Sequence, residues 1–271
     1  MDIIEFKRIA NLIRKKLVVM SHQAGAAHLG SSLSCVDILV SAYWGALNIN
    51  PKDTGWVKRD RFILSKGHAA ATLYAVLSYK GFFPEELLEK YAKHGCCLPE
   101  HPAPKCIPGL EAATGSLGHG LSLGLGMVLA GRIQQQSYRV YVVISDGECN
   151  EGSVWEAAMF APAQKMDNLI AIVDYNKWQA TGRSNEIMAL APLRQKWEAF
   201  GWSVYEIDGH DMDALTKVLK NVPDGTGKPI VVIAHTVKGK GVSFMEDDNN
   251  WHYRIPKEEE VNNALKELGQ L

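Results

Sequence analysis

Two short apolar runs separated by a helical stretch form the clearest pattern in the chain. Residues 140–144 and 169–173 are hydrophobic and rich in β-branched side chains, without polar alternation. Runs of this kind are typical of strands that are buried on both faces. Residues 152–165, between them, have helical character. We predict a strand–helix–strand unit, whose right-handed crossover makes the two strands parallel.

The rest of the hydrophobic pattern predicts further helices and strands. Residues 3–21 carry an apolar stripe at helical spacing, and a helix over 33–47 is expected to begin after Ser32, a favourable N-cap. The other expected strands are 61–64, 202–207 and 230–234, and the other expected helices are 68–79, 84–91, 120–133, 193–200, 211–221 and 258–268. This order predicts an α/β fold with a parallel sheet sandwiched by helices. The long irregular stretch 92–114 is expected to be functional.

Length and charge narrow the class of protein. The 271 residues suffice for one large α/β domain or two small ones, and the formal net charge is −1. We therefore expect neither nucleic acid nor a membrane surface as a partner. The N-terminus is charged and amphipathic, unlike a signal peptide, and no apolar run reaches ~20 residues. A cytoplasmic protein without a membrane span is expected.

The five cysteines are expected to be reduced thiols in such a chain. Cys96, Cys97 and Cys106 lie near His94 and His101, which raises the question of a zinc site. Their spacing fits no standard zinc pattern. We therefore interpret them as incidental loop thiols.

Polar side chains follow both central strands where each strand ends. Asp146-Gly147 comes directly after the first strand, and Asn176 follows the second. The carboxyl ends of parallel strands share one edge of the sheet, where ligands of open α/β sheets bind. Asp146 would offer a carboxylate oxygen, Asn176 an amide oxygen, and the loop after it a carbonyl, at Trp178. This donor set suits Mg²⁺, or Ca²⁺ or Mn²⁺, holding a phosphate, and Gly147 would let a diphosphate approach the backbone.

Three histidines lie in segments that favour contact with a ligand. His28 is flanked by Gly, Ala and Ser, His68 follows the strand at 61–64 and precedes a helix, and His101 lies in the irregular stretch. A helix N-terminus attracts anions, so His68 would face a phosphate. A lone loop histidine is more often a surface residue, and we expect Lys66, beside His68, to be solvated.

A glycine-rich segment, Thr114 to Gly120, opens the helix that ends near Ile133. Its glycines would cost ~1 kcal/mol each in an exposed helix, so we expect close packing against another backbone. A nucleotide-binding loop is the rival interpretation, but G-x-G-x-x-G is absent and no strand precedes the segment. Residues 224–229 likewise lack the P-loop pattern, and we interpret them as a hairpin-like connection into the strand at 230–234.

The central stretch resembles the thiamine diphosphate motif, which starts at Gly-Asp-Gly and ends near a later Asn. Ser145 stands in place of the first Gly. With Glu151-Gly152, Trp155-Glu156-Ala157 and Asn168-Leu169-Ile170, the stretch resembles transketolase in particular, and the resemblance extends over nearly the whole chain. It implies the thiamine diphosphate-binding fold, with residues 1–271 as a single diphosphate-binding domain.

The resemblance also implies roles for individual residues. His28 and His101 would hold substrate hydroxyls and move protons, while His68 and His252 would lie near the cofactor diphosphate and the substrate. Glu151 would hydrogen-bond the glutamate that faces the cofactor's pyrimidine. The residues implied to bind the cofactor are His68, Gly115, Ser116, Leu117, Gly147, Glu151, Asn176 and His252.

Three further segments are less clearly assigned by the resemblance. His119 stands where the family usually has Gln, so its contact is open. Residues 209–211 would be mostly structural. Lys238 and Lys240, between glycines, would close over an anion or be solvated.

In the family, the glutamate that protonates the pyrimidine belongs to a second domain. No such pyrimidine domain follows in residues 1–271. We therefore expect the N-terminal subunit of a split transketolase, with a partner chain that carries the pyrimidine and C-terminal domains in an α2β2 assembly. The complex would transfer a two-carbon ketol unit from a ketose phosphate to an aldose phosphate.

Other functions stay open at this point. The segment His28–Ser32 also resembles deoxyxylulose-phosphate synthase, although residues 235–241 and Trp251-His252 favour transketolase. A specialised ketol transferase for a branched or sulfonated sugar fits equally well. A non-catalytic cofactor-binding or regulatory subunit is the alternative from another class, and the retained polar residues argue against it. A dinucleotide dehydrogenase lacks its glycine fingerprint.

Overall fold

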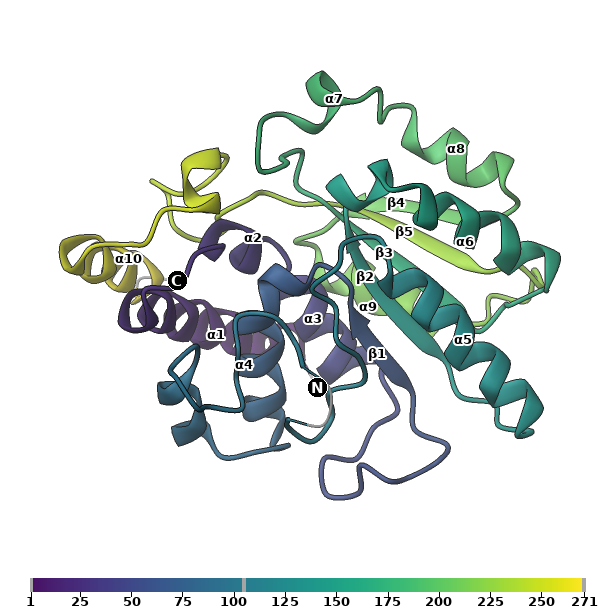
Figure 1. Ribbon diagram of the computed structural model, residues 1–271, viewed down its shortest axis with the longest axis horizontal. Coiled ribbons are helices and arrows are strands. Elements are labelled where there is room, and N and C mark those ends of the chain that lie inside the picture. Colours follow the sequence, from purple (N-terminus) through teal and green to yellow (C-terminus); the bar gives the residue numbers. More distant parts are fainter. Residues whose placement is uncertain (1, 104–105, 270–271) are drawn as a thin grey trace.

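The structure is a computed structural model that describes residues 2–103 and 106–269. Its centre is a parallel sheet of five strands in the order β1-β2-β3-β5-β4 (Figure 1). The strands are β1 (Arg61–Leu64), β2 (Val140–Ser145), β3 (Leu169–Tyr175), β4 (Ser203–Asp208) and β5 (Ile230–His235). The five predicted strands are therefore confirmed, with bounds that differ by two residues or fewer.

Helices cover both faces of the sheet, which explains why every residue of β2 and β3 is buried. One layer contains α1 (Ile3–Ala24), α3 (Val36–Val40), α4 (Ala70–Lys80), α9 (Met212–Lys220) and α10 (Glu258–Gly269), and it shares a hydrophobic cluster with Tyr141 and Val143. The other contains α5 (Gly120–Ile133), α6 (Gly152–Ala163) and α8 (Leu193–Ala199), and its cluster includes Val142 and Ile144. Alternate residues of β2 therefore face opposite layers, and the predicted sandwich is confirmed.

The register of the central strands brings their carboxyl ends to one edge. Ser145 pairs with Asp174 between β2 and β3, and Tyr175 pairs with His235 between β3 and β5. The residues that follow these pairs therefore leave the sheet side by side. This edge is where the candidate site lies.

The helix predicted over 33–47 is wrong in its start and its continuity. α2 (Leu29–Ser34) begins earlier, Cys35 separates it from α3, and η1 (Ser41–Ala46) is a π-helix. Ser32 therefore lies inside α2 and caps nothing. A Cβ added to Gly45 would lie 2.8 Å from the Thr216 side chain of α9, so close tertiary packing accompanies the irregular turn.

Smaller differences concern short elements. The helix predicted over 84–91 is a 3₁₀ helix, η3 (Glu85–Lys90), in which only Leu88 is buried. The 3₁₀ turns η2 (Gly67–Ala69), η4 (Gly147–Asn150) and η5 (Asn249–His252) and the helix α7 (Ser184–Ile187) were not predicted. The connection at 224–229 is not hairpin-like, because β5 lies parallel to both of its neighbours.

The described part of the stretch 92–114 contains no helix or strand, as predicted, and residues 104 and 105 of it lie outside the described residues. A search of the described residues finds no helix that is both long and apolar enough to cross a membrane.

Candidate active site

A cavity of about 430 Å³ opens at the carboxyl edge of the sheet. The predicted site residues come to it from six separate segments of the sequence. The predicted residues that line it are His28, His68, His101, Gly115, Leu117, Gly147, Glu151, Asn176, Trp178 and His252. Asp146 and Ser116 are not part of the lining. Asp146 is fully buried beside Gly147, and Ser116 is exposed next to Leu117.

Asp146 ends β2 as a buried carboxylate without an ion pair in the described part of the chain. It accepts hydrogen bonds from the Gly147 N–H (2.9 Å), the Lys177 N–H (2.9 Å) and the Ser184 hydroxyl (2.8 Å). Burial raises the pKa of this carboxyl to about 7, against the effect of these donors. A divalent cation would supply the opposite charge that this group lacks, so the residue fits the predicted metal site.

Asn176 and Trp178 lie in the turn that follows β3. The backbone bends at Lys177, whose φ is 70°. The side-chain oxygen of Asn176 accepts from the Trp178 N–H (3.0 Å), and its amide nitrogen donates to Ser34 (3.3 Å). The turn therefore places an amide oxygen and backbone carbonyls beside Asp146. These are the oxygen ligands that a hard cation takes.

Glu148, which the sequence analysis did not name, connects three loops around the cavity. It is fully buried and accepts from the Gly118 N–H (2.9 Å), the Ser145 N–H (2.8 Å) and the Ser65 hydroxyl. Burial raises the pKa of this carboxyl. The Ser145 hydroxyl, in the place of the motif's first Gly, is 3.3 Å from the same carboxylate, so the departure from the motif is accommodated by a hydrogen bond.

Four histidine rings cluster on one side of the cavity. The ring centroid of His28 is 5.4 Å from that of His68, 6.2 Å from that of His101 and 5.0 Å from that of His252. The backbone of His28 has a φ of 70°, and its N–H donates to the His252 carbonyl (2.8 Å). The left-handed turn therefore ties the N-terminal segment to the end of η5.

Three of these histidines, His28, His68 and His252, are neutral near pH 7. Burial lowers the pKa of His28 to about 4 and that of His252 to about 3, and it holds the pKa of His68 well below the usual value. The neighbouring lysines and histidines lower these pKa values further. Neutral imidazoles can both accept and donate a hydrogen bond, which suits them to hold hydroxyl groups.

Two buried lysines stand close to the histidines. Lys66 is fully buried and pairs with Asp174, so the expectation that it is solvated is wrong. Lys238 is also fully buried, and its Nζ lies 2.6 Å from the Asn249 side-chain oxygen and 3.1 Å from Nδ1 of His252. Burial lowers the pKa of Lys238 to about 8, so the ammonium form still predominates at pH 7. Because an ammonium only donates, Nδ1 of His252 accepts, and Nε2 carries the proton.

The glycine turn and Glu151 form the opposite rim of the cavity. Gly118 has a φ of 82°, and a Cβ there would lie 2.6 Å from the Glu151 side chain. Leu117 is 40% exposed, and Glu151 is exposed at the start of α6. His119 is exposed outside the lining and lies 3.1 Å from the Leu117 carbonyl. This rim is therefore open to a further ligand or protein surface.

Some lining residues were not predicted. Ser31, Gln179 and Tyr253 line the cavity, and Tyr253, 65% exposed, packs edge-on against His252 with centroids 4.7 Å apart. Each lies close in sequence to a residue that was named. Proximity to a predicted site residue was therefore the one available signal.

The cysteines do not assemble a metal site among the described residues. Cys96, Cys97 and Cys106 are partly exposed free thiols, and Cys35 and Cys149 are buried. No group of three or more His, Cys, Asp or Glu side chains in residues 2–103 and 106–269 is arranged to hold a metal ion.

The histidine cluster predicts a stability that depends on pH. We expect the histidines to lower the stability of the chain without cofactor as the pH falls below about 6.5, the usual histidine pKa, while Asp146, whose pKa is about 7 in the folded state, acts in the opposite direction. The unfolded state binds protons there, whereas folded His28 and His252 do so only near their pKa values of about 4 and about 3. Thermal unfolding midpoints measured between about pH 7 and about pH 5 test this.

The double variant His28→Gln/His252→Gln should show a smaller loss over that range. The exposed His94→Gln serves as the control. An equal loss in the double variant and the wild type would contradict this assignment.

Comparisons with known proteins identify relatives of this chain. The family described as "Transketolase, thiamine diphosphate binding domain" matches residues 6–270. An apulose-4-phosphate transketolase subunit of Phocaeicola vulgatus is 40% identical over 257 residues, which cover 95% of this chain and 91% of that protein. The 6-deoxy-6-sulfo-D-fructose transketolase subunit SqwG of a Clostridium species is 42% identical, with coverages of 98% and 96%.

Longer relatives match only in part. A transketolase of Pongo abelii is 38% identical over 93% of this chain but 40% of its own length. Among solved structures, a transketolase from Campylobacter jejuni superposes with a TM-score of 0.91 at 30% identity, over 99% of this chain and 43% of that one. The chain thus matches proteins named as transketolase subunits nearly end to end and the longer proteins over less than half.

Proposed function

Since this chain belongs to the transketolase family, in which it matches the thiamine diphosphate-binding domain, we propose that it is one subunit of a two-chain ketol transferase. The complex would move a two-carbon ketol unit from a ketose phosphate to an aldose phosphate. The observation that carries the proposal is the nearly end-to-end match with relatives named as transketolase subunits. The assembly of the predicted histidines around one cavity with Gly147 and Asn176 supports it.

The residues at the sheet edge fit thiamine diphosphate and a divalent cation. We assign Asp146, Asn176 and the Trp178 carbonyl as ligands of Mg²⁺, or of Ca²⁺ or Mn²⁺. Gly147 leaves room at its Cα, since a Cβ there would lie 3.4 Å from Gln179, so a diphosphate would approach the backbone closely at this residue. Gly115, Ser116 and Leu117 would contact the ring end of the cofactor. When bound, the cofactor supplies the carbanion chemistry of carbon–carbon bond cleavage.

The chain's own side chains would position the sugar and move protons. His28 and His101 would each hold a hydroxyl of the donor, and proton transfer by such groups contributes roughly 10²–10⁴-fold to a rate. His252 would donate from Nε2, because Lys238 occupies Nδ1. His68, which lies beside both His28 and His252, would contact the diphosphate. Glu151 would bond a glutamate supplied by the partner.

We propose that residues 1–271 form a single diphosphate-binding domain and that the partner supplies the pyrimidine and C-terminal domains. Two copies of each chain would form an α2β2 assembly. The predicted cytoplasmic location stays a prediction.

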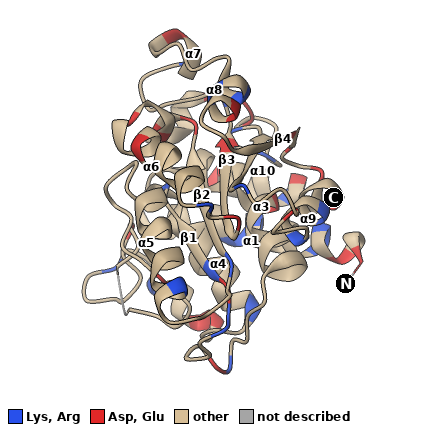
Figure 2. Cartoon of the chain, turned by 90° about the vertical axis from the view of Figure 1, so that its right-hand side faces the viewer, with Lys and Arg blue, Asp and Glu red and all other residues tan. Residues whose placement is uncertain are grey.

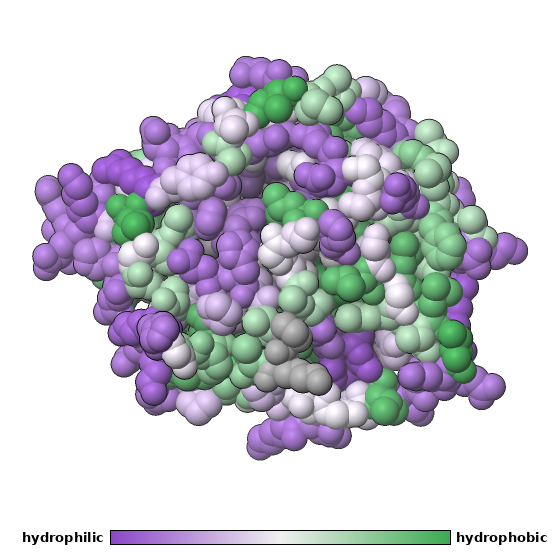
Figure 3. Space-filling model, in the orientation of Figure 1, coloured by the Kyte–Doolittle hydropathy of each residue, from purple (hydrophilic) through white to green (hydrophobic). Residues whose placement is uncertain are grey.

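An exposed apolar surface supports the need for a partner. Leu123 and Ile133 of α5 are 41% and 83% exposed, and Met159 and Phe160 of α6 are 56% and 42% exposed. Few charged residues lie along these helices, as Figure 2 shows, and hydrophobic side chains gather over them on the right-hand side of Figure 3. Leu117, which lines the cavity, precedes α5. We propose that this surface receives the partner beside the open rim of the site.

Phe160→Glu should weaken the complex without unfolding the chain. A charge in the centre of an apolar interface typically costs about tenfold or more in affinity, whereas an exposed side chain contributes little to the fold. Leu12→Glu, at a residue that is 37% exposed on α1 in the opposite helix layer, is the matched control. Equal partner affinity in both variants would show that the partner binds elsewhere.

The sugar is not determined by the family alone. Relatives are named for apulose 4-phosphate and for 6-deoxy-6-sulfo-D-fructose. A branched or sulfonated sugar is therefore the specialised alternative to an ordinary ketose phosphate as the donor substrate. The remaining alternatives are a non-catalytic subunit or a deoxyxylulose-phosphate-synthase-like activity, and no specific contact favours either.

Affinity purification from the source cells, followed by mass spectrometry, tests the two-chain proposal. We expect a stoichiometric second chain of roughly 300 residues, an ordinary size for one or two domains. Elution of the chain with itself alone would overturn the proposal that a partner completes the site.

A further inference from the structure

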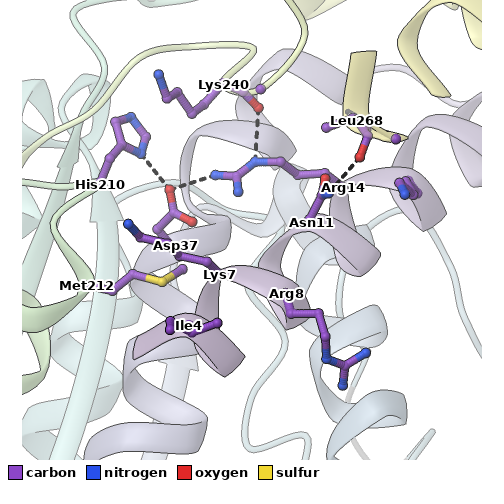
Figure 4. Close-up of a pocket in the computed structure, with 13 residues that line it drawn as sticks. Ile4, Lys7, Arg8, Asn11, Arg14, Asp37, His210, Met212, Lys240 and Leu268 are labelled. Atoms are coloured by element: carbon purple, nitrogen blue, oxygen red, sulfur yellow. Dashed lines mark hydrogen bonds and ion pairs between the residues drawn. The ribbon is translucent and has the colours of Figure 1, made fainter. Parts of the chain in front are cut away.

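A second cavity, of about 670 Å³, shares no lining residue with the candidate active site. It lies between α1, the end of α10, the turn before α9 and residues 240–241 (Figure 4). Nothing in the proposed chemistry uses this space. Its lining and its connections point to a binding function.

Basic side chains outnumber acidic ones in the lining of this cavity. Lys7, Arg8, Arg14, Lys15 and Lys240 line it, and Asp37 is the one carboxylate among the lining residues. Asp37 is already neutralised, because its Oδ2 lies 2.6 Å from Arg14 and 2.7 Å from His210. The cavity therefore has an excess of positive charge.

Two of these cations are free to meet a ligand. Arg8 pairs with Glu5, and Lys240 pairs with Glu246 at 3.2 Å. Lys7 and Lys15 have no ion pair within residues 2–103 and 106–269. They lie eight residues apart on α1, with Asn11 midway, so all three share one helix face.

Asn11, in the lining of the same cavity, presents a side-chain oxygen that has no hydrogen-bond donor among the described residues. Its amide nitrogen donates to the Leu268 carbonyl (2.6 Å), while its side-chain oxygen is buried without a partner among the described residues. Because Asn11 lines the cavity, a rotation of its side chain would let a hydroxyl group of a ligand satisfy this oxygen. The combination of two free ammonium groups and one orphaned acceptor fits a phosphate that carries hydroxyl groups.

The floor of the cavity is connected to the candidate active site. Nε of Arg14 donates to the Lys240 carbonyl (3.1 Å), and Nε2 of His210 accepts from the Val237 N–H (2.9 Å). Lys238 lies between these two anchors and contacts His252. Next to it, the Gly239 N–H donates to the Gly30 carbonyl (2.9 Å), two residues from His28.

We propose that this cavity binds a small hydroxylated organic phosphate, and that occupancy alters turnover through residues 237–241. The binding site stands on the geometry of the cavity alone. The effect on turnover rests on the proposed function, since it needs an active complex.

Titration calorimetry with glycerol 2-phosphate tests the binding step. The chain is saturated with Mg²⁺ and thiamine diphosphate, so that the candidate active site is occupied. Wild type should bind one equivalent, and Lys7→Ala/Lys15→Ala should lose at least about tenfold in affinity, since hydrogen bonds to charged groups are among the stronger ones. Lys217→Ala/Lys220→Ala, which removes two exposed lysines from α9, is the control with matched charge and should bind like wild type.

Absence of saturable binding, or equal affinity in the two double variants, would overturn the site. The turnover step is tested on the complex with its partner. Saturating glycerol 2-phosphate should change kcat or KM by about fivefold in wild type and in the α9 control, and not in Lys7→Ala/Lys15→Ala. Binding without any change in turnover would refute the coupling between this cavity and turnover, while the proposed binding site would still stand. An inactive complex with intact binding would count against the proposed function alone.

Discussion

Replacing Asp146 with asparagine should reduce the metal-dependent affinity for thiamine diphosphate at least about 100-fold. Loss of an outer-shell partner already costs up to about this factor in metal affinity, and Asp146 is assigned as a direct ligand. Its carboxylate is buried, is held by three donors and has no ion pair among the described residues. The measurement is calorimetric titration of thiamine diphosphate in the presence of Mg²⁺, on the complex with its partner.

The matched control is Asp213→Asn, at an exposed carboxylate of α9. It should leave the affinity unchanged. Thermal unfolding without cofactor separates binding from folding, and Asp146→Asn should melt near the wild type, because a buried charge is removed while the side-chain shape is kept. Affinity within about threefold of wild type in Asp146→Asn would refute the metal assignment.

Lys66→Met should destabilise the fold by about 3–5 kcal/mol, the usual cost of breaking a buried ion pair. Lys66 and Asp174 are both completely buried, and Lys66 also donates to the Ser31 carbonyl (2.8 Å). Burial acts to lower the pKa of Lys66, but Asp174 more than reverses this and raises it. Removing the ammonium leaves Asp174 charged and without its counterion. Urea denaturation of the chain without cofactor measures the change.

The exposed pair of Lys217 and Asp213 gives the comparison. Lys217→Met should cost less than about 1 kcal/mol, as surface pairs typically do. A loss in Lys66→Met no larger than that of Lys217→Met would contradict a stabilising role for the buried pair. Such a result would also reopen the expectation that Lys66 faces solvent.

The sheet could be predicted because buried parallel strands have a recognisable local sequence pattern. Residues 140–144 and 169–173 are apolar throughout, as buried strands with helices on both faces must be, and the structure places them as β2 and β3. The position of Asp146 and Asn176 follows from the same pattern. Their meeting at one edge needed no knowledge of side-chain packing.

The wrong or missing predictions concern residues whose surroundings are set by contacts with parts of the chain that are distant in sequence. Lys66 looked like a surface residue, because its partner Asp174 is 108 residues away. Glu148 escaped notice because its donors come from Ser65 and Gly118, far back in the chain. The π-helix at 41–46 goes with packing of Gly45 against α9, which no local propensity reports. The histidine cluster was predicted from resemblance, since spacing alone does not bring His28 to His252.

Ketol transfer by the purified two-chain complex tests the central claim most directly. The complex is incubated with a ketose phosphate and an aldose phosphate, and mass spectrometry follows a two-carbon shift between them. The account predicts a shift that needs both chains, thiamine diphosphate and a divalent cation, with branched and sulfonated ketoses as further donors in the same assay. Transfer without thiamine diphosphate, or a cofactor-loaded complex that moves no two-carbon unit from any of these donors, would contradict it.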